Sequence, residues 1–130
     1  MFNCPYYILD PLYRANLYNI NISVNTHTLI LYKNNKIFKT YRIAVGKPST
    51  PTPKGNFKIV NKAMNPGGPF GARWLGLNAP NGDYGIHGTK NPSSIGRNVS
   101  NGCIRMYNND VIELSSLVPI GTQVTINWNS

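Results

Sequence analysis

Acidic residues and histidines are scarce in this chain of 130 residues. Its four carboxylates and two histidines are Asp10, Asp83, Asp110, Glu113, His27 and His87. These residues are too few and too scattered to favour catalysis by two neighbouring carboxylates. They also do not favour a metal site, which needs three or four clustered ligands. The sequence therefore predicts no metal and no cofactor, and any chemistry must use few residues.

Cysteine is equally rare, because Cys4 and Cys103 are the only two. They lie 99 positions apart (103 minus 4) and form no C-x-x-C pair. A zinc ribbon and a thioredoxin-type site are therefore unsupported. A disulfide between them is arithmetically possible, but the sequence around Cys103 argues against it.

Long hydrophobic runs are also absent. No segment approaches the roughly 20 apolar residues that a transmembrane helix needs, so we expect no transmembrane segment. The opening MFNCPYYILDPLYRANLY has no basic start and is interrupted by Pro5, Asp10 and Pro11, which is not the pattern of a secretory signal. An export signal is thus not visible in this chain.

Basic residues, in contrast, are plentiful. Lysine and arginine number 13 against 4 acidic residues, which gives a net charge of +9. A hydrophobic fraction of 41% excludes a disordered chain, and the length predicts one compact domain with its own core. The charge suits a polyanionic partner. Because the basic residues are spread from Arg14 to Arg105 without a clustered stripe, we expect no nucleic acid.

Alternating apolar and polar residues predict short strands along most of the chain. Residues 20–45 predict a hairpin whose turn holds Asn34 and Asn35, two residues that tolerate positive φ. Further strands are expected near residues 57–59, 74–77, 84–86 and 124–128. A helix is expected over residues 109–118, with Asn108 or Asn109 as its N-cap. The pattern indicates a mainly β fold, an antiparallel β-sandwich or open barrel with one short helix.

The rare reactive residue types gather in YGIHGTKNPSSIGRNVSNGCIRMY, between Tyr84 and Tyr107. His87 and Cys103 are 16 positions apart (103 minus 87), and the loop between them lets their side chains meet. A nearby imidazole lowers the pKa of a thiol and takes its proton, which produces a nucleophilic thiolate. Gly102 lets the backbone approach closely, so the amides of residues 102 and 103 could form an oxyanion hole. A buried structural cysteine is the alternative interpretation.

The motif HGT at residues 87–89, followed by SNGCIR at residues 100–105, resembles the signature of the L,D-transpeptidase catalytic domain, the YkuD family. The upstream segments AVGKPSTPTPKGNF and NPGGPFGARWLGL stand in the family's order as well. The chain looks closest to the small Gram-positive members. The resemblance implies a catalytic domain over residues 21–130, preceded by an N-terminal arm at 1–20. From their aromatic character, the tyrosines of this arm are expected to pack on the sheet, with a sugar-stacking surface as the alternative.

The resemblance also implies roles for single residues. Cys103 would be the nucleophile, and His87 its general base, oriented by a backbone carbonyl. The residues implied to shape the site, with the amides of residues 102 and 103 at the oxyanion, are Ser100, Gly102, Arg105 and Gly88. Arg105 could equally be structural. Weaker candidates for substrate contact are Trp74, Tyr84 and Asn101, the last standing where many members have a second histidine.

Acyl transfer between peptidoglycan stem peptides is the activity that the resemblance implies. A tetrapeptide stem acylates Cys103 with loss of its terminal D-alanine, and an amine then takes the acyl group, forming a 3,3 cross-link. Carbapenems are implied as covalent inhibitors, and the bacterial cell wall or spore envelope as the extracytoplasmic location. Three alternatives stay open: an L,D-carboxypeptidase, another cysteine peptidase, and a non-catalytic wall-binding module.

Overall fold

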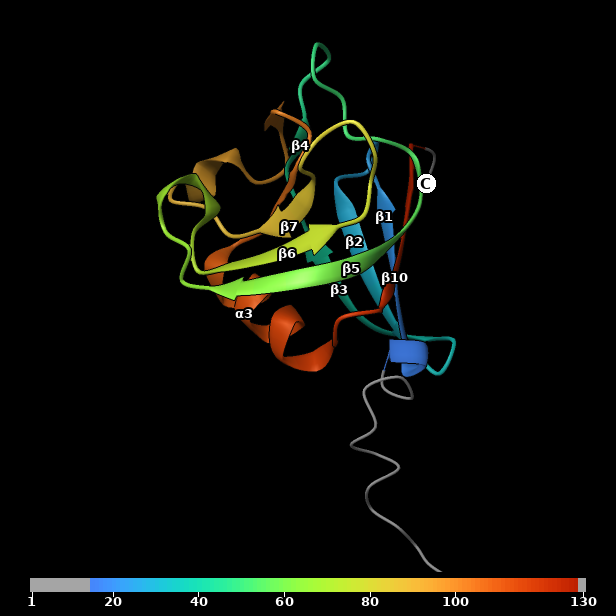
Figure 1. The fold of residues 1–130 in the computed structure, drawn as a ribbon. Coiled ribbons are helices and arrows are strands. Elements are labelled where there is room, and N and C mark those ends of the chain that lie inside the picture. Colours follow the sequence, from blue (N-terminus) through green and yellow to red (C-terminus); the bar gives the residue numbers. More distant parts are fainter. Residues whose placement is uncertain (1–14, 129–130) are drawn as a thin grey trace, which may run out of the picture.

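The structure is a computed structural model that describes residues 15–128 (Figure 1). Its first elements are β1 (Tyr18–Ser23), β2 (Thr28–Lys33), β3 (Lys36–Arg42), β4 (Val45–Gly46), β5 (Gly55–Met64) and the 3-10 turn η1 (Gly68–Phe70). The remaining elements are β6 (Arg73–Leu77), β7 (Gly85–His87), the 3-10 turn η2 (Pro92–Ser94), β8 (Asn98–Ser100), β9 (Ile104–Arg105), α3 (Asn108–Leu117) and β10 (Gln123–Asn127).

Eight strands form one curled sheet in the order β3-β2-β1-β10-β5-β6-β7-β9, and β4 pairs with β8 in a second, small sheet. The mainly β, open-barrel-like fold is confirmed. Most neighbouring strands are antiparallel, as expected, whereas β1–β10, β7–β9 and β4–β8 are parallel pairs. Parallel neighbours need a long crossover between them. The loop between His87 and Cys103 lies in one such crossover, from β7 to β9.

The curl of the sheet follows from the ten-residue strand β5 (Figure 1). Its first part pairs with β10 and its second part with β6, and the register shifts between Ile59 and Asn61. Such an irregularity bends a strand and increases its twist. One continuous strand therefore joins the β3-β2-β1-β10 part of the sheet to the β6-β7-β9 part, which carries the candidate site.

Two local predictions have different outcomes. The hairpin turn is confirmed, since Asn34 and Asn35 have φ of 53° and 63° between β2 and β3. The helix is confirmed as α3, but its N-cap is Tyr107 and no side chain caps it. The amide side chain of Asn108 is engaged elsewhere, as described below.

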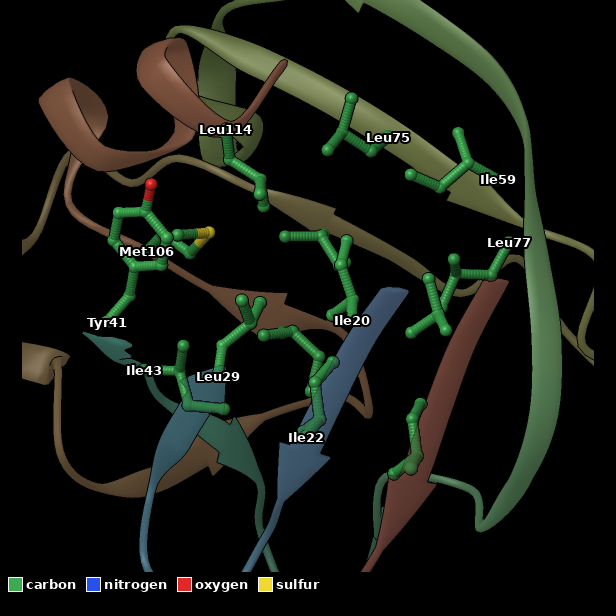
Figure 2. Close-up of a cluster of buried hydrophobic side chains, with 14 of the residues drawn as sticks. Ile20, Ile22, Leu29, Tyr41, Ile43, Ile59, Leu75, Leu77, Met106 and Leu114 are labelled. Carbon is green, nitrogen blue, oxygen red and sulfur yellow. The ribbon is translucent and has the colours of Figure 1, made fainter. Parts of the chain in front are cut away.

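The hydrophobic core lies inside the curl, with α3 closing it against β6 and β7 (Figure 2). Strand residues alternate between this core and the outside, so that Ile20, Ile22, Leu29 and Ile59 are fully buried. Each buried aliphatic side chain contributes about 1.5–3 kcal/mol relative to an exposed one. The core thus holds the strands of the site in place without a disulfide or metal among the described residues.

Tyr18, in the expected N-terminal arm, begins β1 and is buried in the core. The arm's other tyrosines, Tyr6, Tyr7 and Tyr13, lie outside the described residues, as does Cys4. Within residues 15–128, no helix has the length and apolar character to cross a membrane.

Candidate functional site

The parallel pairing of β7 with β9 brings the two ends of the motif together. His87 lies opposite Arg105 in the register, and Cys103 immediately precedes β9. The main-chain nitrogen of Met106 donates to the carbonyl of His87 at 2.8 Å, which closes the crossover. His87 and Cys103 therefore line the same cavity of about 170 Å³, and Ser100, Asn101 and Arg105 line it with them.

His87 is buried, with 4% of its surface exposed. Its Nδ1 lies 2.5 Å from the carbonyl oxygen of Gly88. A carbonyl oxygen only accepts hydrogen bonds, so Nδ1 carries the proton and Nε2 of the neutral ring is left as the basic atom. Burial lowers the pKa of His87 below its ordinary 6.5, and the charge of Arg105 lowers it further, against the Gly88 hydrogen bond. The ring is therefore neutral at pH 7.

Cys103 is a free, half-buried thiol. Its Sγ donates to the carbonyl oxygen of Asp83 at 3.6 Å. Burial raises the pKa of the thiol above its ordinary 9.0, and a backbone hydrogen bond from Gly85 and the charge of Arg105 oppose this only partly. The expectation of a thiol with a lowered pKa is wrong for this conformation. The site instead holds a neutral thiol beside a neutral imidazole.

Ser100 organises the loop that carries the thiol. Its Oγ accepts a hydrogen bond from the Gly102 amide at 3.0 Å and donates one to the Cys103 carbonyl at 2.6 Å. The Gly102 amide is thus engaged within the loop, so the expectation that it binds an oxyanion is not supported by this geometry. Gly102 has φ of 117°, and a Cβ there would lie 2.6 Å from Cε1 of Tyr84, so the position requires glycine.

The proline-rich loop at residues 47–54 supports Ser100 from the other side. Thr50 Oγ1 and the amide of Lys47 both donate to the Ser100 carbonyl, at 2.8 and 3.0 Å. The amide of Gly46 donates to Thr52 Oγ1 at 3.0 Å, which ties the loop back on itself. Sequence reasoning missed this function of the loop, because its partners lie about 50 positions away in the chain.

An aromatic group surrounds His87. Trp74 stacks on the imidazole, with ring centroids 5.9 Å apart and an interplanar angle of 20°. Phe70, which sequence reasoning did not single out, meets both rings edge-on, at 5.2 Å from His87 and 5.0 Å from Trp74. Trp74 Nε1 donates to Asn61 Oδ1 at 3.0 Å, which fixes the indole in place.

A larger pocket of about 420 Å³ adjoins this aromatic group. We call it the aromatic pocket, and its walls include Asn61, Pro66, Phe70, Trp74, Asp83 and Tyr84. Its volume falls within the roughly 300–1,000 Å³ of typical small-molecule sites. Phe70 belongs to this pocket and to the Cys103 cavity, so the two are neighbours.

The remaining candidate residues occupy different places around the cavity. The main chain of Arg105 exchanges two hydrogen bonds with that of Ala44, at 2.9 and 3.0 Å, which is a structural role. Arg105 also lines the cavity, so the two predicted roles of this residue are compatible. Asn101 is exposed at the cavity. Gly88 faces Asn108 Oδ1 and the amide of Ala72 so closely that a Cβ would collide with both.

Asn108 is a supporting residue that sequence reasoning misassigned. Its Oδ1 accepts hydrogen bonds from the amides of Ala72 and Thr89, each at 3.1 Å, and its Nδ2 donates to the Thr89 carbonyl at 3.0 Å. It thereby joins the first residue of α3 to Ala72, just before β6, and to Thr89, two residues after His87. An asparagine beside a helix start can be recognised in the sequence, but the sequence does not reveal its hydrogen-bond partners Ala72 and Thr89.

Other reactive residue types do not extend the site. His27 hydrogen-bonds Asn98 at 2.5 Å, and neither residue lines the cavity. Among residues 15–128 no group of three His, Cys, Asp or Glu could hold a metal ion.

Comparison with known protein sequences identifies the family of this chain. The sequence model of YkuD, the L,D-transpeptidase catalytic domain, matches residues 18–126. YkuD of Bacillus subtilis is 61% identical over 110 residues, which are 85% of this chain and 66% of YkuD. The chain thus spans just under two thirds of the length of that relative.

Solved structures agree with the sequence comparison. The Ldtfm–avibactam carbamoyl enzyme superposes with a TM-score of 0.76 at 26% identity, covering 88% of this chain and 50% of that one. The catalytic domain of the Enterococcus faecium L,D-transpeptidase gives a TM-score of 0.73 at 27% identity, covering 85% and 96%. The chain therefore belongs to the YkuD family of L,D-transpeptidase catalytic domains.

Proposed function

We propose that the chain is a cysteine L,D-transpeptidase that acts on peptidoglycan stem peptides outside the cytoplasm. The observation that carries the proposal is the cavity in which the Cys103 thiol and the neutral His87 ring lie together. In a binding module neither side chain would be needed there. The net charge of +9 supports a partner rich in carboxylates and phosphates, such as the cell wall.

In the first step, Cys103 Sγ attacks the carbonyl carbon of the third stem residue, and its proton passes to Nε2 of His87. The bond from that carbon to the nitrogen of the terminal D-alanine then breaks, and the same proton moves to the leaving nitrogen. A thioester on Cys103 and free D-alanine are the products. The Gly88 carbonyl keeps the proton on Nδ1, so Nε2 is the atom that exchanges it.

In the second step, an amine from a neighbouring stem attacks the thioester carbon. His87 Nε2 takes a proton from the amine and returns it to the sulfur as the carbon–sulfur bond breaks. The product is a 3,3 cross-link. If water attacks instead, the product is a shortened stem and the activity is that of an L,D-carboxypeptidase.

Four parts of the chain support these steps. The Ser100 hydrogen bonds hold the thiol loop, and the positive side chain of Arg105 favours negative charge at the cavity. With the Gly102 amide engaged, the Cys103 amide is the remaining main-chain candidate for the oxyanion. Asn101, which is exposed and lines the cavity, would contact the stem.

Mass spectrometry of the protein and of a Cys103→Ala variant, each with a disaccharide-tetrapeptide carrying diaminopimelate, tests the proposal. We expect a thioester adduct and a cross-linked dimer lighter by one D-alanine, both absent from Cys103→Ala. Tripeptide alone would identify a carboxypeptidase. If neither protein reacts and both are retained equally by purified cell wall, the proposal is wrong and a binding module is indicated.

Covalent inhibition follows from the same chemistry. The thiolate formed at Cys103 opens the ring of a carbapenem, and the neighbour that forms a carbamoyl enzyme with avibactam supports the reactivity of this kind of site. We expect imipenem to add its mass once to the wild-type protein and not to Cys103→Ala.

A further inference from the structure

Asp83 occupies a distinctive position for one of only four acidic residues in a chain of net charge +9. Glu113 is paired with Lys39, and Asp110 lies in the first turn of α3. Asp83 lines the aromatic pocket and has no ion-pair partner among the described residues. Its carboxylate is therefore available to a cationic ligand.

The aromatic walls of the pocket suit the apolar part of a cationic ligand. Phe70, Trp74 and Tyr84 provide aromatic surface for a methylene chain, and aromatic faces attract cations as well. The Oδ1 of Asn61 already accepts from Trp74. Asp83 is the one charged residue among those that line the pocket, so the pocket favours a ligand with a positive charge.

The pocket also lies beside the reacting sulfur. The carbonyl of Asp83 accepts the thiol hydrogen bond, and the carboxylate charge of the same residue adds to the increase in the pKa of Cys103 that burial causes. Phe70 lines both this pocket and the cavity of His87 and Cys103. A molecule bound in the pocket therefore lies next to the cavity that holds the thiol.

We propose that the aromatic pocket binds an alkylammonium group, with the ammonium at the Asp83 carboxylate and its methylene chain against Trp74 and Tyr84. This deepens the proposed function and rests on it for the identity of the substrate. Two parts of stem peptides carry this chemistry: the side chain of the third residue of the donor stem, and the attacking side-chain amine of the acceptor stem.

Binding is tested without catalysis, in the Cys103→Ala protein. The probe is Nα-acetyl-lysine amide, followed by the NMR shift of the Trp74 indole N–H. The indole N–H of Trp128, which donates to Thr52 away from the pocket, is the internal reference. We expect Asp83→Asn to weaken binding about tenfold or more, as loss of a charge-assisted hydrogen bond does, and Asp110→Asn to leave it unchanged. The Nε-acetylated probe should not bind.

Kinetics with the Cys103 enzyme then separate the two sources. If the donor side chain occupies the pocket, Asp83→Asn slows thioester formation with a stem bearing a free amine and not with its acetylated form. If the acceptor occupies it, thioester formation is unchanged and the ratio of cross-link to hydrolysis falls. Equal binding of both probes, or equal binding by Asp83→Asn and wild type, overturns the proposal. A wild type that binds the probe but forms no thioester contradicts the proposed function alone.

Discussion

Trp74 stacks on the ring of His87, and Asn61 accepts a hydrogen bond from its indole nitrogen. The tryptophan comes from β6 and the histidine from β7, and the two residues are opposite each other in the antiparallel register. The stacked indole keeps water from one face of the imidazole. In the proposed mechanism, Trp74 is thus a positioning residue that also sets the environment of the His87 base.

Replacing Trp74 with alanine exposes His87, so its pKa should rise toward 6.5 and its ring should lose orientation. We expect kcat/KM for thioester formation to fall about 10- to 100-fold, corresponding to roughly 1.4–2.7 kcal/mol, and the acid limb of the pH profile to move to higher pH. The matched variant Asn61→Ala removes only the indole's acceptor and should give a smaller loss. An unchanged pH profile in Trp74→Ala would contradict this role.

The pH dependence of acylation follows from the two shifted pKa values. The pKa of His87 lies below 6.5 and that of Cys103 above 9.0, both chiefly because of burial, so the neutral pair predominates between them. Acylation by a carbapenem should rise with pH as His87 loses its proton, with a midpoint below 6.5. Alkylation of Cys103 by iodoacetamide needs the thiolate itself and should have its midpoint above 9.0. An alkylation midpoint below 7 would indicate a preformed thiolate.

Loss of the Asn108 side chain should destabilise the fold near the site. Asn108→Ala removes three hydrogen bonds that join α3 to the segments around Ala72 and Thr89. We expect the free energy of unfolding to fall by about 1–3 kcal/mol, measured by urea denaturation. Asn109→Ala, on the exposed neighbour, should change it by less than about 0.5 kcal/mol. Equal effects of the two variants would argue against the interaction.

Glu113 links stability to acid pH. Its carboxylate accepts from Lys39 Nζ and Tyr41 Oη, both at 2.6 Å, and the Lys39 bond, with that of Tyr41, lowers the pKa of Glu113 below its ordinary 4.5. A pKa lower in the folded than in the unfolded state stabilises the protein above 4.5, and this is lost as pH falls through the folded value. The pair is partly exposed to solvent, so the effect is at most about 1 kcal/mol. Unfolding of Glu113→Gln should therefore depend less steeply on pH between about 5 and 3.

Local features of the fold were predictable because they depend on neighbouring residues. Asn34 and Asn35 adopt the positive φ that a tight turn requires, and the periodicity of residues 109–118 predicts α3 from its own apolar face. The motif around His87 and Cys103 likewise identified which two side chains line one cavity.

Features that depend on distant partners were not predictable in this way. Parallel pairing of β7 with β9 is decided by the whole sheet, and nothing in the local alternation distinguishes it from antiparallel pairing. Asn108 has the sequence position of an N-cap, but its side-chain oxygen accepts hydrogen bonds from the amides of Ala72 and Thr89 instead. The pKa of Cys103 was misjudged because it depends on burial, which a single sequence does not specify.

A buried thiol that ionises late is also slow to oxidise, since peroxides react with the thiolate. In the proposed mechanism, the environment that raises the pKa of Cys103 thus protects the sulfur until a substrate is bound and His87 takes the proton of the thiol. Hydrogen peroxide should convert Cys103 to its sulfenic acid more slowly than it oxidises free cysteine at pH 7, as peptide mass mapping would measure. The enzyme would then remain competent in surroundings where an activated cysteine would be consumed.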